Sequence, residues 1–377
     1  MRVFVIAGEA SGDKLGAALM SGLRSLTDVT FDGVGGPRMI AEGLVSRFSM
    51  DELSVMGLTE ILPKYRALKA RVREMAQAVL DTKPDVLITI DAPEFSLRVA
   101  KLVKAKSDIR CVHYVAPTVW AWRPKRAAHM AGHIDQVLAL FPFEPPYMEA
   151  AGMRCDFVGH PVVTDQIATP QEAAAWSGES PLVLMLPGSR RSEVKRLMAR
   201  FGDVAGQVAQ AHPHARFVIP TTDNVTALVR DLAQEWPVAP QILNAQDKAE
   251  KRGVFAAADI AVAASGTVSL ELAANATPMV IAYDMSPISR MIIGRMLRVD
   301  TVTLVNLVSE TRSIPEFIGA NCVAADIAQG VNDVLADPAA QYDAMAVTMD
   351  KLGLGGDAPG LRAARAVLDG LGRDHRG

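Results

Sequence analysis

With 377 residues, the chain is long enough for two domains, and its 50% of hydrophobic residues excludes a disordered or fibrous protein. A net charge of −3 and a pI near 6.2 argue against nucleic acid as a partner, because domains that bind it are strongly basic. Cys111, Cys155 and Cys322 are far apart and form neither a disulfide framework nor a metal-ligand spacing, so we expect a reducing cytoplasm and no metal site.

Short β-branched runs alternate with helical stretches along the whole chain. In the first half, 2–7 (RVFVIA), 85–90 (DVLITI) and 110–115 (RCVHYV) are typical of buried parallel strands, and 14–26 and 94–105 of the helices between them. The second half repeats this pattern, with strands predicted over 182–186, 216–220, 259–264 and 278–283. The alternation predicts an α/β protein with two Rossmann-like, doubly wound domains. The N-terminal apolar run is too short for a signal peptide, and no stretch is long enough to span a membrane.

Residues 159–181 mix Gly, Pro and polar residues without a strand pattern and predict the break between the domains. We therefore expect an N-terminal domain over residues 1–165, a C-terminal domain over 166–345 and a helical tail over 346–377. Ligands of open α/β sheets bind beyond the carboxyl ends of the strands. The site is expected there, in a cleft between the domains.

Two strand ends of the first half carry candidate residues. AGEASGD (7–13) combines small residues with Ser11 at a strand-to-helix turn, which lets a ligand approach the helix N-terminus, or is a tight turn capped by Ser11 or Asp13. The strand at 85–90 is followed by Asp91 and, two residues on, a proline. A carboxylate there can act as a general base or cap the helix that begins near Glu94. The residues alone leave both alternatives open.

The loop YVAPTVWAWRPKR (114–126) holds two of the four tryptophans and three cations. These five residues are Trp120, Trp122, Arg123, Lys125 and Arg126. Tryptophan supplies apolar surface with a polar edge, and the cations suit an anionic group. The residues alone leave open whether the loop faces a ligand or is a buried tryptophan anchor with cations at the surface.

Two turns of the second half have the character of phosphate-binding turns. PGSRRSEV (187–194) places Arg190 beside free backbone amides at a helix start. Ser265, Gly266 and Thr267 form the second turn, and Glu271 lies one helical turn further on, where it can accept hydrogen bonds from ribose hydroxyls. Because no DxD run for magnesium lies between them, the pair indicates a nucleoside diphosphate held by amides and arginine.

The motifs together resemble lipid-A-disaccharide synthases, from residue 3 to about residue 310. The motifs that carry the resemblance are AGEASGD, GVGGPRM, ELSVMGLTEIL, IDAPEF, HYVAPTVWAWRPKR, LPGSRRSEV, ASGTVSLELA and VNL. The resemblance implies a GT-B glycosyltransferase without a cofactor that moves 2,3-diacylglucosamine from UDP-2,3-diacylglucosamine to 2,3-diacylglucosamine 1-phosphate. Inversion at the anomeric carbon gives a β-1′-6 disaccharide and UDP.

Matched position by position, the resemblance implies that Asp91 is the base. Arg190 lies on the UDP side, as does Asn306, which follows a short VxL strand, and the Trp120–Trp122 loop lies beside the acceptor. It also implies an enzyme at the cytoplasmic face of the inner membrane of a Gram-negative bacterium, and it leaves a homodimer open. The alternatives are a UDP-sugar epimerase, a nicotinamide-dependent dehydrogenase (which would need a GxGxxG turn) and a non-catalytic nucleotide-sugar binding protein.

Residues 56–80 mix apolar and basic side chains, as an interfacial helix does. We expect Pro63 to break this helix, so that Leu58, Ile61 and Leu62 form an apolar tip that docks peripherally on a membrane surface. The alternative is an ordinary amphipathic helix packed on the first domain, which is favoured from Val72 onward.

Overall fold

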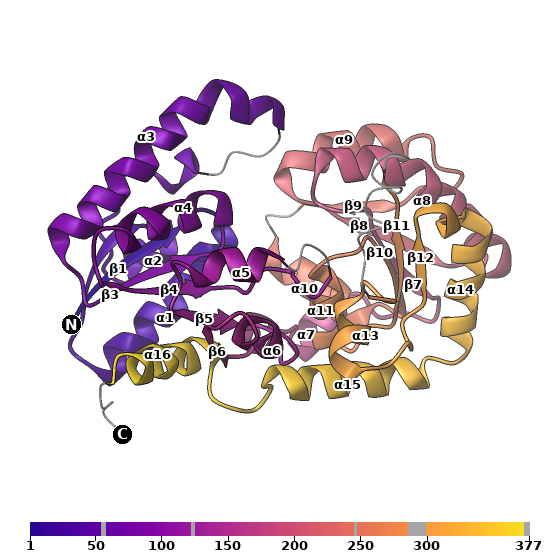
Figure 1. Cartoon of the computed structure of the whole chain (residues 1–377). Coiled ribbons are helices and arrows are strands. Elements are labelled where there is room, and N and C mark those ends of the chain that lie inside the picture. Colours follow the sequence, from indigo (N-terminus) through magenta and orange to yellow (C-terminus); the bar gives the residue numbers. More distant parts are fainter. Residues whose placement is uncertain (54–57, 122–124, 245–246, 286–298, 373–377) are drawn as a thin grey trace. The chain divides into compact units, whose positions relative to one another are not determined.

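The computed structural model describes residues 1–53, 58–121, 125–244, 247–285 and 299–372, without the side chains of residues 58–65. The chain forms two compact units, shown in Figure 1: unit 1 is Met1–Thr164 with Gly355–Gly377, and unit 2 is Asp165–Leu354. Each unit holds a six-stranded parallel sheet with helices on both faces, so the predicted α/β, doubly wound fold is confirmed. The residues expected to form a C-terminal tail, 346–377, are divided between the two units.

Unit 1 has the strand order β2-β1-β3-β4-β5-β6. Its strands are β1 (Arg2–Ala7), β2 (Thr30–Val34), β3 (Val86–Ile90), β4 (Arg110–Tyr114), β5 (Gln136–Ala139) and β6 (Arg154–Phe157). Its helices are α1 (Ala10–Leu26), α2 (Pro37–Ala41), α3 (Leu58–Thr82), α4 (Pro93–Lys104), α5 (Lys125–Ala131), α6 (Pro145–Glu149) and α16 (Pro359–Gly370), with short 3₁₀ turns at Met50–Glu52 and Pro161–Thr164.

Side chains of the unit 1 strands alternate between the two faces of the sheet, as the period of a strand requires. Phe4 and Ile6 of β1 belong to the core cluster that α3, α4 and α5 cover. On the other face α1 approaches the sheet so closely that a Cβ at Gly16 would lie 3.0 Å from the Ile90 side chain. The two helical layers bury both faces, so the central strands β1 and β3 are almost entirely apolar.

Helix α16 returns to unit 1 from the far end of the chain and packs on α1 (Figure 1). Two glycines permit the close approach of the two helices: a Cβ at Gly360 would lie 2.5 Å from the carbonyl oxygen of Ala18, and one at Gly22 would lie 2.7 Å from that of Gly360. Gln136 of β5 donates from Nε2 to the carbonyl of Ala366 (2.8 Å) and so joins α16 to the sheet.

Unit 2 has the strand order β12-β11-β10-β7-β8-β9. Its strands are β7 (Leu182–Leu186), β8 (Arg216–Pro220), β9 (Gln241–Leu243), β10 (Ile260–Ala263), β11 (Met279–Tyr283) and β12 (Glu316–Ile318). Its helices are α7 (Pro170–Ala174), α8 (Arg191–Ala211), α9 (Asp223–Ala233), α10 (Lys248–Ala257), α11 (Val268–Ala274), α13 (Leu304–Ser309), α14 (Ala324–Ala336) and α15 (Ala339–Leu352), with a 3₁₀ turn at Gly319–Asn321.

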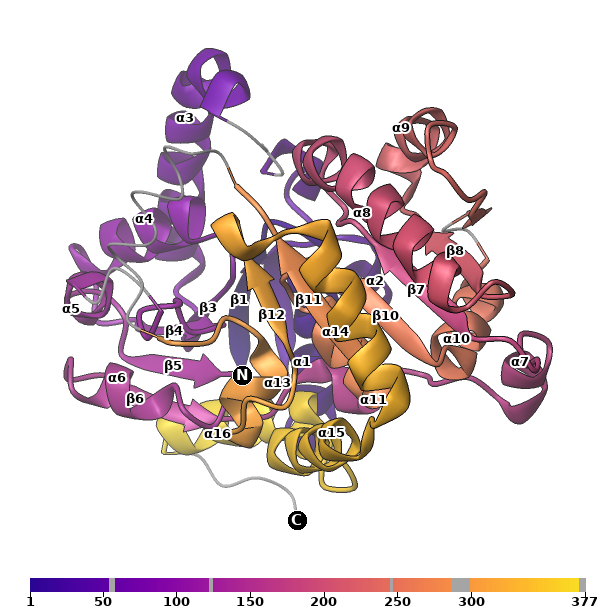
Figure 2. The ribbon, with the colours of Figure 1, turned by 90° about the vertical axis from the view of Figure 1, so that its right-hand side faces the viewer.

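Helices α8, α9 and α14 share one apolar core with the unit 2 sheet, and Figure 2 shows α14 running across the sheet beside α8. Helices α10 and α11 contact β7 and β10. Every strand predicted in the second half is present, and so are the three predicted in the first half.

Two local expectations are wrong. Helix α3 starts at Leu58 and continues through Pro63 to Thr82, so the proline does not break it. Its missing N–H falls in the second turn of a 25-residue helix, where one lost hydrogen bond is outweighed by the later turns, which bury Val72 and Met75 in the core. The strand expected before Asn306 is also absent, because Asn306 lies inside α13.

Candidate functional site

The direction of chain progress reverses at one point in each sheet. In unit 1 the chain runs from β1 to β2 and then returns to the other side of β1 as β3, so the reversal lies between β1 and β3, where Ala7 pairs with Ile90. In unit 2 it lies between β7 and β10, where Leu186 pairs with Ala263. Doubly wound folds bind their ligands beyond the strand ends at such points. Seven of the residues predicted for a site follow these four strands, namely Ser11, Asp91, Arg190, Ser265, Gly266, Thr267 and Glu271.

A pocket of about 420 Å³ opens at the reversal point of unit 2. It is lined by the segments that follow β7, β8 and β10 and by α10: Leu186, Gly188, Ser189, Arg190, Glu193, Pro220, Thr221, Thr222, Lys251, Phe255, Ala264, Ser265, Gly266, Thr267, Val268 and Glu271. Five residues predicted for the nucleotide side are therefore brought together, namely Arg190, Ser265, Gly266, Thr267 and Glu271.

Arg190 is the N-cap residue of α8, at the positive end of a 21-residue helix. Its backbone N–H and one guanidinium nitrogen both donate to Glu193, each at 3.3 Å. Gly188, with φ of 104°, makes this arrangement possible, because a Cβ there would lie 2.5 Å from Glu193 Oε2. The Arg190 side chain is 68% exposed and therefore has room to turn toward an anion.

Lys251, Thr221 and Thr222 were not predicted to belong to the site. Lys251 Nζ on α10 lies 2.9 Å from Glu271 Oε2 on α11, and both side chains line the pocket. Thr221 and Thr222 follow β8, and their position after the apolar run 216–220 was a usable signal. The sequence gives no such signal for Lys251, because α10 has the pattern of any charged amphipathic helix.

Asn306 does not line this pocket. Its side chain is buried, its Nδ2 donates to the Ile314 carbonyl (2.9 Å) and Thr301 Oγ1 (3.2 Å), and its Oδ1 accepts from Ile314 N–H (3.0 Å). Both ends of the amide are thus occupied within unit 2. The amide thus holds residues 301–314 together, and its place on the UDP side stays a prediction.

Asp91 follows β3 at the reversal point of unit 1, with a backbone conformation that is uncommon for residues other than glycine. Asp91 and Ala92 both have positive φ, 48° and 43°. Such conformations cost about 1–3 kcal/mol each and cluster at functional sites. The N-cap residue of α4 is Ala92, without a side-chain cap, so the alternative that Asp91 caps the helix is wrong. Within the part of the chain that the structure describes, the partly exposed Asp91 carboxylate makes no hydrogen bond or ion pair.

The turn after β1 lies directly against the turn after β3. A Cβ at Gly8 would lie 2.8 Å from Ala92 Cβ, so only glycine permits this approach. Ser11 is exposed in the first turn of α1 and so belongs to the same strand-end region as Asp91. The alternative that Ser11 or Asp13 caps this turn is wrong, since the N-cap residue of α1 is Glu9 and no side chain caps it.

Asp13 instead caps a different helix. Its buried carboxylate accepts hydrogen bonds from the backbone N–H groups of Gly36 (2.9 Å), Arg38 (3.0 Å) and Met39 (3.0 Å) at the start of α2. A carboxylate suits this place because the first N–H groups of a helix have no partner within it. Asp13 therefore fixes the segment after β2 beside the turn that carries Ser11.

The aromatic loop is divided between buried and exposed residues. Trp120 is buried and its ring meets Phe143 edge to face at 5.1 Å, so it anchors the loop in unit 1, which corrects the expectation that it faces the acceptor. Trp122 and Arg123 lie outside the described residues. Lys125 is exposed at the start of α5, and Arg126 lies 3.9 Å from Glu94 in the first turn of α4. The described cations of the loop thus lie next to the helix that follows Asp91.

A buried carboxylate lies beneath this loop. Glu144 Oε2 accepts from the backbone N–H groups of Leu140 (3.1 Å) and Phe141 (3.0 Å), and burial raises its pKa to about 7. His113 of β4 is a core residue: it bonds to Thr89 Oγ1 at 2.8 Å, and burial lowers its pKa to about 3. His113 is therefore neutral near pH 7 and cannot serve as a cation in a site.

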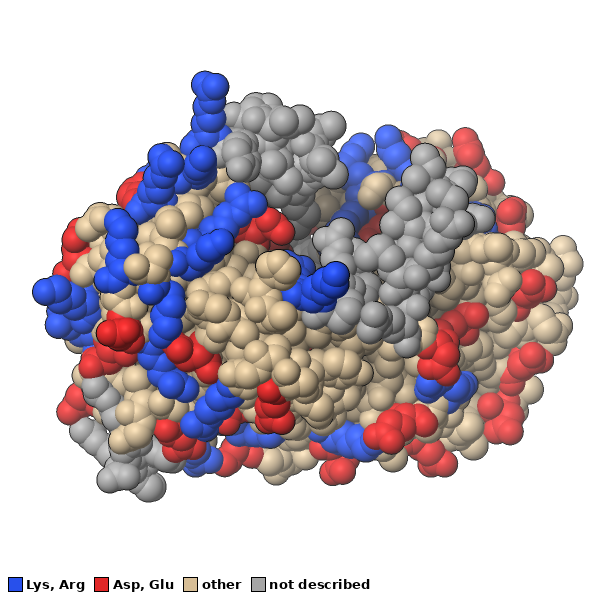
Figure 3. Space-filling model, viewed as in Figure 1, with Lys and Arg blue, Asp and Glu red and all other residues tan. Residues whose placement is uncertain are grey.

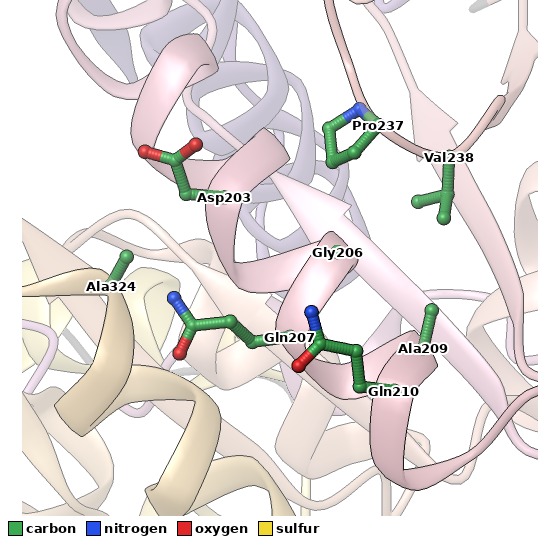
Figure 4. A pocket seen from close by; sticks show the side chains of 8 residues that line it. All are labelled: Asp203, Gly206, Gln207, Ala209, Gln210, Pro237, Val238 and Ala324. Atoms are coloured by element: carbon green, nitrogen blue, oxygen red, sulfur yellow. The ribbon is translucent and has the colours of Figure 1, made fainter.

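A second hollow of unit 2, shown in Figure 4, lies on the outer side of α8. Its lining residues are Asp203, Gly206, Gln207, Ala209, Gln210, Pro237, Val238 and Ala324. Five of them lie in the second half of α8, Pro237 and Val238 precede β9, and Ala324 begins α14, so none belongs to the segments that directly follow β7, β8 or β10. The geometry therefore favours the pocket at β7 and β10 as the ligand site.

A family model described as lipid-A-disaccharide synthetase matches residues 3–355 of the chain. Two relatives named lipid-A-disaccharide synthase are similar over nearly the full length. The protein from Ruegeria pomeroyi is 60% identical, across 98% of this chain and 96% of its own. The protein from Rhodospirillum centenum is 43% identical, across 97% and 94%.

Solved structures share the architecture at much lower sequence identity. The UDP-GlcNAc 2-epimerase of Neisseria meningitidis, solved bound to UDP-GlcNAc, has a TM-score of 0.67 at 13% identity and covers 98% of this chain and 99% of its own. MurG of Acinetobacter baumannii has a TM-score of 0.56 at 14% identity, with 98% and 99% covered. The calicheamicin glycosyltransferase CalG4 has a TM-score of 0.60 at 18% identity, with 99% and 98% covered. At such identities the likeness shows the fold alone.

Proposed function

The chain belongs to the lipid-A-disaccharide synthase family, and from this premise we propose how it forms the lipid A disaccharide. Unit 2 binds UDP-2,3-diacylglucosamine, and unit 1 binds 2,3-diacylglucosamine 1-phosphate at the strand ends that carry Asp91. Because the family model and the relatives are named for disaccharide synthesis, the epimerase and binding-protein alternatives are not favoured.

The observation that carries the donor side is the pocket at β7 and β10. A nucleoside diphosphate needs amides and cations for its phosphates and acceptors for its ribose. In the pocket, Arg190 and the backbone amides at the start of α8 can bind the phosphates, and the Glu271 carboxylate can accept from the ribose. This composition supports the proposal that UDP is the group held there.

The transfer then needs one base and one stabilised leaving group. Asp91 removes the proton from the 6-hydroxyl of the acceptor, and O6 attacks the anomeric carbon on the face opposite to UDP. The bond from that carbon to the phosphate oxygen breaks, with its electron pair left on UDP, which inverts the configuration. Arg190 acts most strongly at this stage, because the diphosphate gains negative charge as the bond breaks.

A UDP-release assay tests the proposal with the purified chain. We expect UDP when both acylated sugars are present and none when either is omitted, whereas an epimerase would act on the UDP-sugar alone. Production of UDP without the acceptor, or an epimerised UDP-sugar, would refute the proposed transfer. A binding protein would retain UDP-sugar and release nothing.

We further propose that unit 1 docks on the cytoplasmic face of the inner membrane, where diacylated substrates lie. Among the described residues, no helix is long and apolar enough to cross a bilayer. Arg66, Lys69 and Arg73 are exposed on α3, and Figure 3 shows Lys and Arg side chains gathered over this part of unit 1. Such cations favour anionic head groups. The structure does not describe the side chains of Leu58, Ile61 and Leu62. We propose that they insert into the apolar part of the membrane surface.

A further inference from the structure

The nucleotide pocket carries balanced charges in two ion pairs. Among the described residues that line it, the cations are Arg190 and Lys251 and the carboxylates are Glu193 and Glu271. Arg190 pairs with Glu193 at 3.3 Å and Lys251 with Glu271 at 2.9 Å. Each carboxylate therefore has its own cation before any ligand enters.

The two pairs differ in construction. Arg190 and Glu193 belong to the same helix start, and Glu193 also accepts from the Arg190 backbone, so that pair closes the first turn of α8. Lys251 and Glu271 instead join two helices, α10 and α11. This second pair has no part in capping a helix, so its function must be sought in the pocket itself.

Lys251 is fixed from two sides. Its ammonium lies 5.0 Å above the centre of the Phe255 ring, which is almost completely buried, and bonds to Oε2 of Glu271. A cation over a ring face gains electrostatic attraction, so the ring restricts the flexible lysine stem. Within the described residues, Oε1 of Glu271 makes no hydrogen bond. One carboxylate oxygen is therefore held and the other remains for a ligand.

We propose that Lys251 is a positioning residue that holds the Glu271 carboxylate ready to accept from both ribose hydroxyls, so that the pocket selects ribonucleoside over 2′-deoxyribonucleoside diphosphates. The inference rests on the proposed function, since it takes the pocket as the UDP site. A carboxylate accepts only, and each of its oxygens has two lone pairs, so Oε2 can accept from Lys251 and one hydroxyl while Oε1 accepts from the neighbouring hydroxyl. A 2′-deoxy ligand lacks one of those donors and leaves an acceptor unpaired.

Calorimetric titration of the full chain with UDP and with 2′-deoxy-UDP tests this. We expect the wild-type protein to prefer UDP by about tenfold or more, the effect of one hydrogen bond to a charged group. Lys251→Met should lower that preference about fivefold, in keeping with a partly exposed ion pair. Glu271→Gln should lower it at least as far, and Lys251→Arg should restore it. Lys248→Met is the matched control on α10, because Lys248 is exposed and does not line the pocket.

Each other outcome has a distinct meaning. If Lys251→Met weakened the binding of UDP and of 2′-deoxy-UDP equally, Lys251 would act only as a cation that binds the phosphates. That result would overturn the inference. An unchanged preference would overturn it as well. A wild-type protein that binds neither ligand would refute the proposed UDP site itself. If Lys251→Met lowers the melting temperature, the preference for UDP over 2′-deoxy-UDP is compared between Lys251→Gln and Lys251→Arg instead. Equal preferences of these two variants would overturn the inference.

Discussion

The direction of the Asp91 side chain is set by the main chain. Asp91 and Ala92 are both left-handed, and the Asp91 N–H bonds to the Tyr114 carbonyl at 3.0 Å, so the carboxylate leaves the sheet at a defined point. A proposed base held in this way needs no partner side chain to orient it. A substitution that removes the charge of the Asp91 side chain should therefore leave its position unchanged.

We predict that Asp91→Asn lowers the rate of transfer by about 10²–10⁴-fold, the usual contribution of a general base, with little effect on folding. UDP release under saturating substrates measures the rate, and thermal unfolding checks the fold. Glu94→Gln is the control, since Glu94 is an exposed carboxylate in the next helical turn. Near-normal turnover of Asp91→Asn would place the base elsewhere.

Glu144 predicts a pH dependence of stability. An unfolded glutamate titrates near 4.5 and the folded one near 7, so between these values the folded protein holds the extra proton. The free energy of unfolding should therefore fall as the pH rises from about 4.5 to about 7. Glu144→Gln cannot ionise and should lack this part of the slope. Urea denaturation at a series of pH values measures it, and parallel curves for the two proteins would contradict the prediction.

At the scale of elements, the contact between Asp13 and α2 should be important for stability. Asp13→Ala leaves three backbone N–H groups without their acceptor, two of those bonds being buried, and we expect a loss of about 3 kcal/mol. The urea midpoint measures this loss. Asp108→Ala, an exposed aspartate of the same unit, should change stability by less than about 0.5 kcal/mol. Equal midpoints for the two variants would show that water replaces the carboxylate.

The sequence predicted the elements with long apolar runs and missed those without them. β3 and β7 are nearly continuous apolar stretches. Asp91 follows the first directly and Arg190 lies four residues after the second, so predicting each strand also located the site residue beyond its end. β2 contains Asp32 and Gly33, and β12 has three residues, so neither shows a strand pattern. The partners of Asp13 lie 23 to 26 residues away, and a contact at that distance has no local signature. For the same reason the sequence could not separate the buried Trp120 from an exposed one.

At the scale of the whole molecule, the basic surface of α3 should determine membrane binding. Each cation near an anionic membrane contributes about 1 kcal/mol, so Arg66→Gln combined with Lys69→Gln should weaken binding to vesicles that contain anionic lipids about 30-fold. Sedimentation with vesicles measures this. Activity on detergent-dispersed substrate should stay unchanged.

The matched control changes two exposed cations of unit 2, Lys195→Gln with Arg230→Gln, and should bind vesicles like the wild type. Equal losses for both double variants would indicate a general charge effect. Unaltered binding of the α3 variant would remove α3 from the membrane contact.

The position of α16 sets the order in which the units can be completed during translation. Unit 2 is one continuous segment, residues 165–354, whereas unit 1 still needs residues 355–377 after that segment has left the ribosome. Domains generally fold as they emerge, the earlier one first. Here the unit that begins first must finish last, and until it does, the side of α1 that Gly360 and Ala364 will cover stays open. We expect a nascent chain halted near residue 354 to hold a finished unit 2 beside a unit 1 that chaperones still recognise.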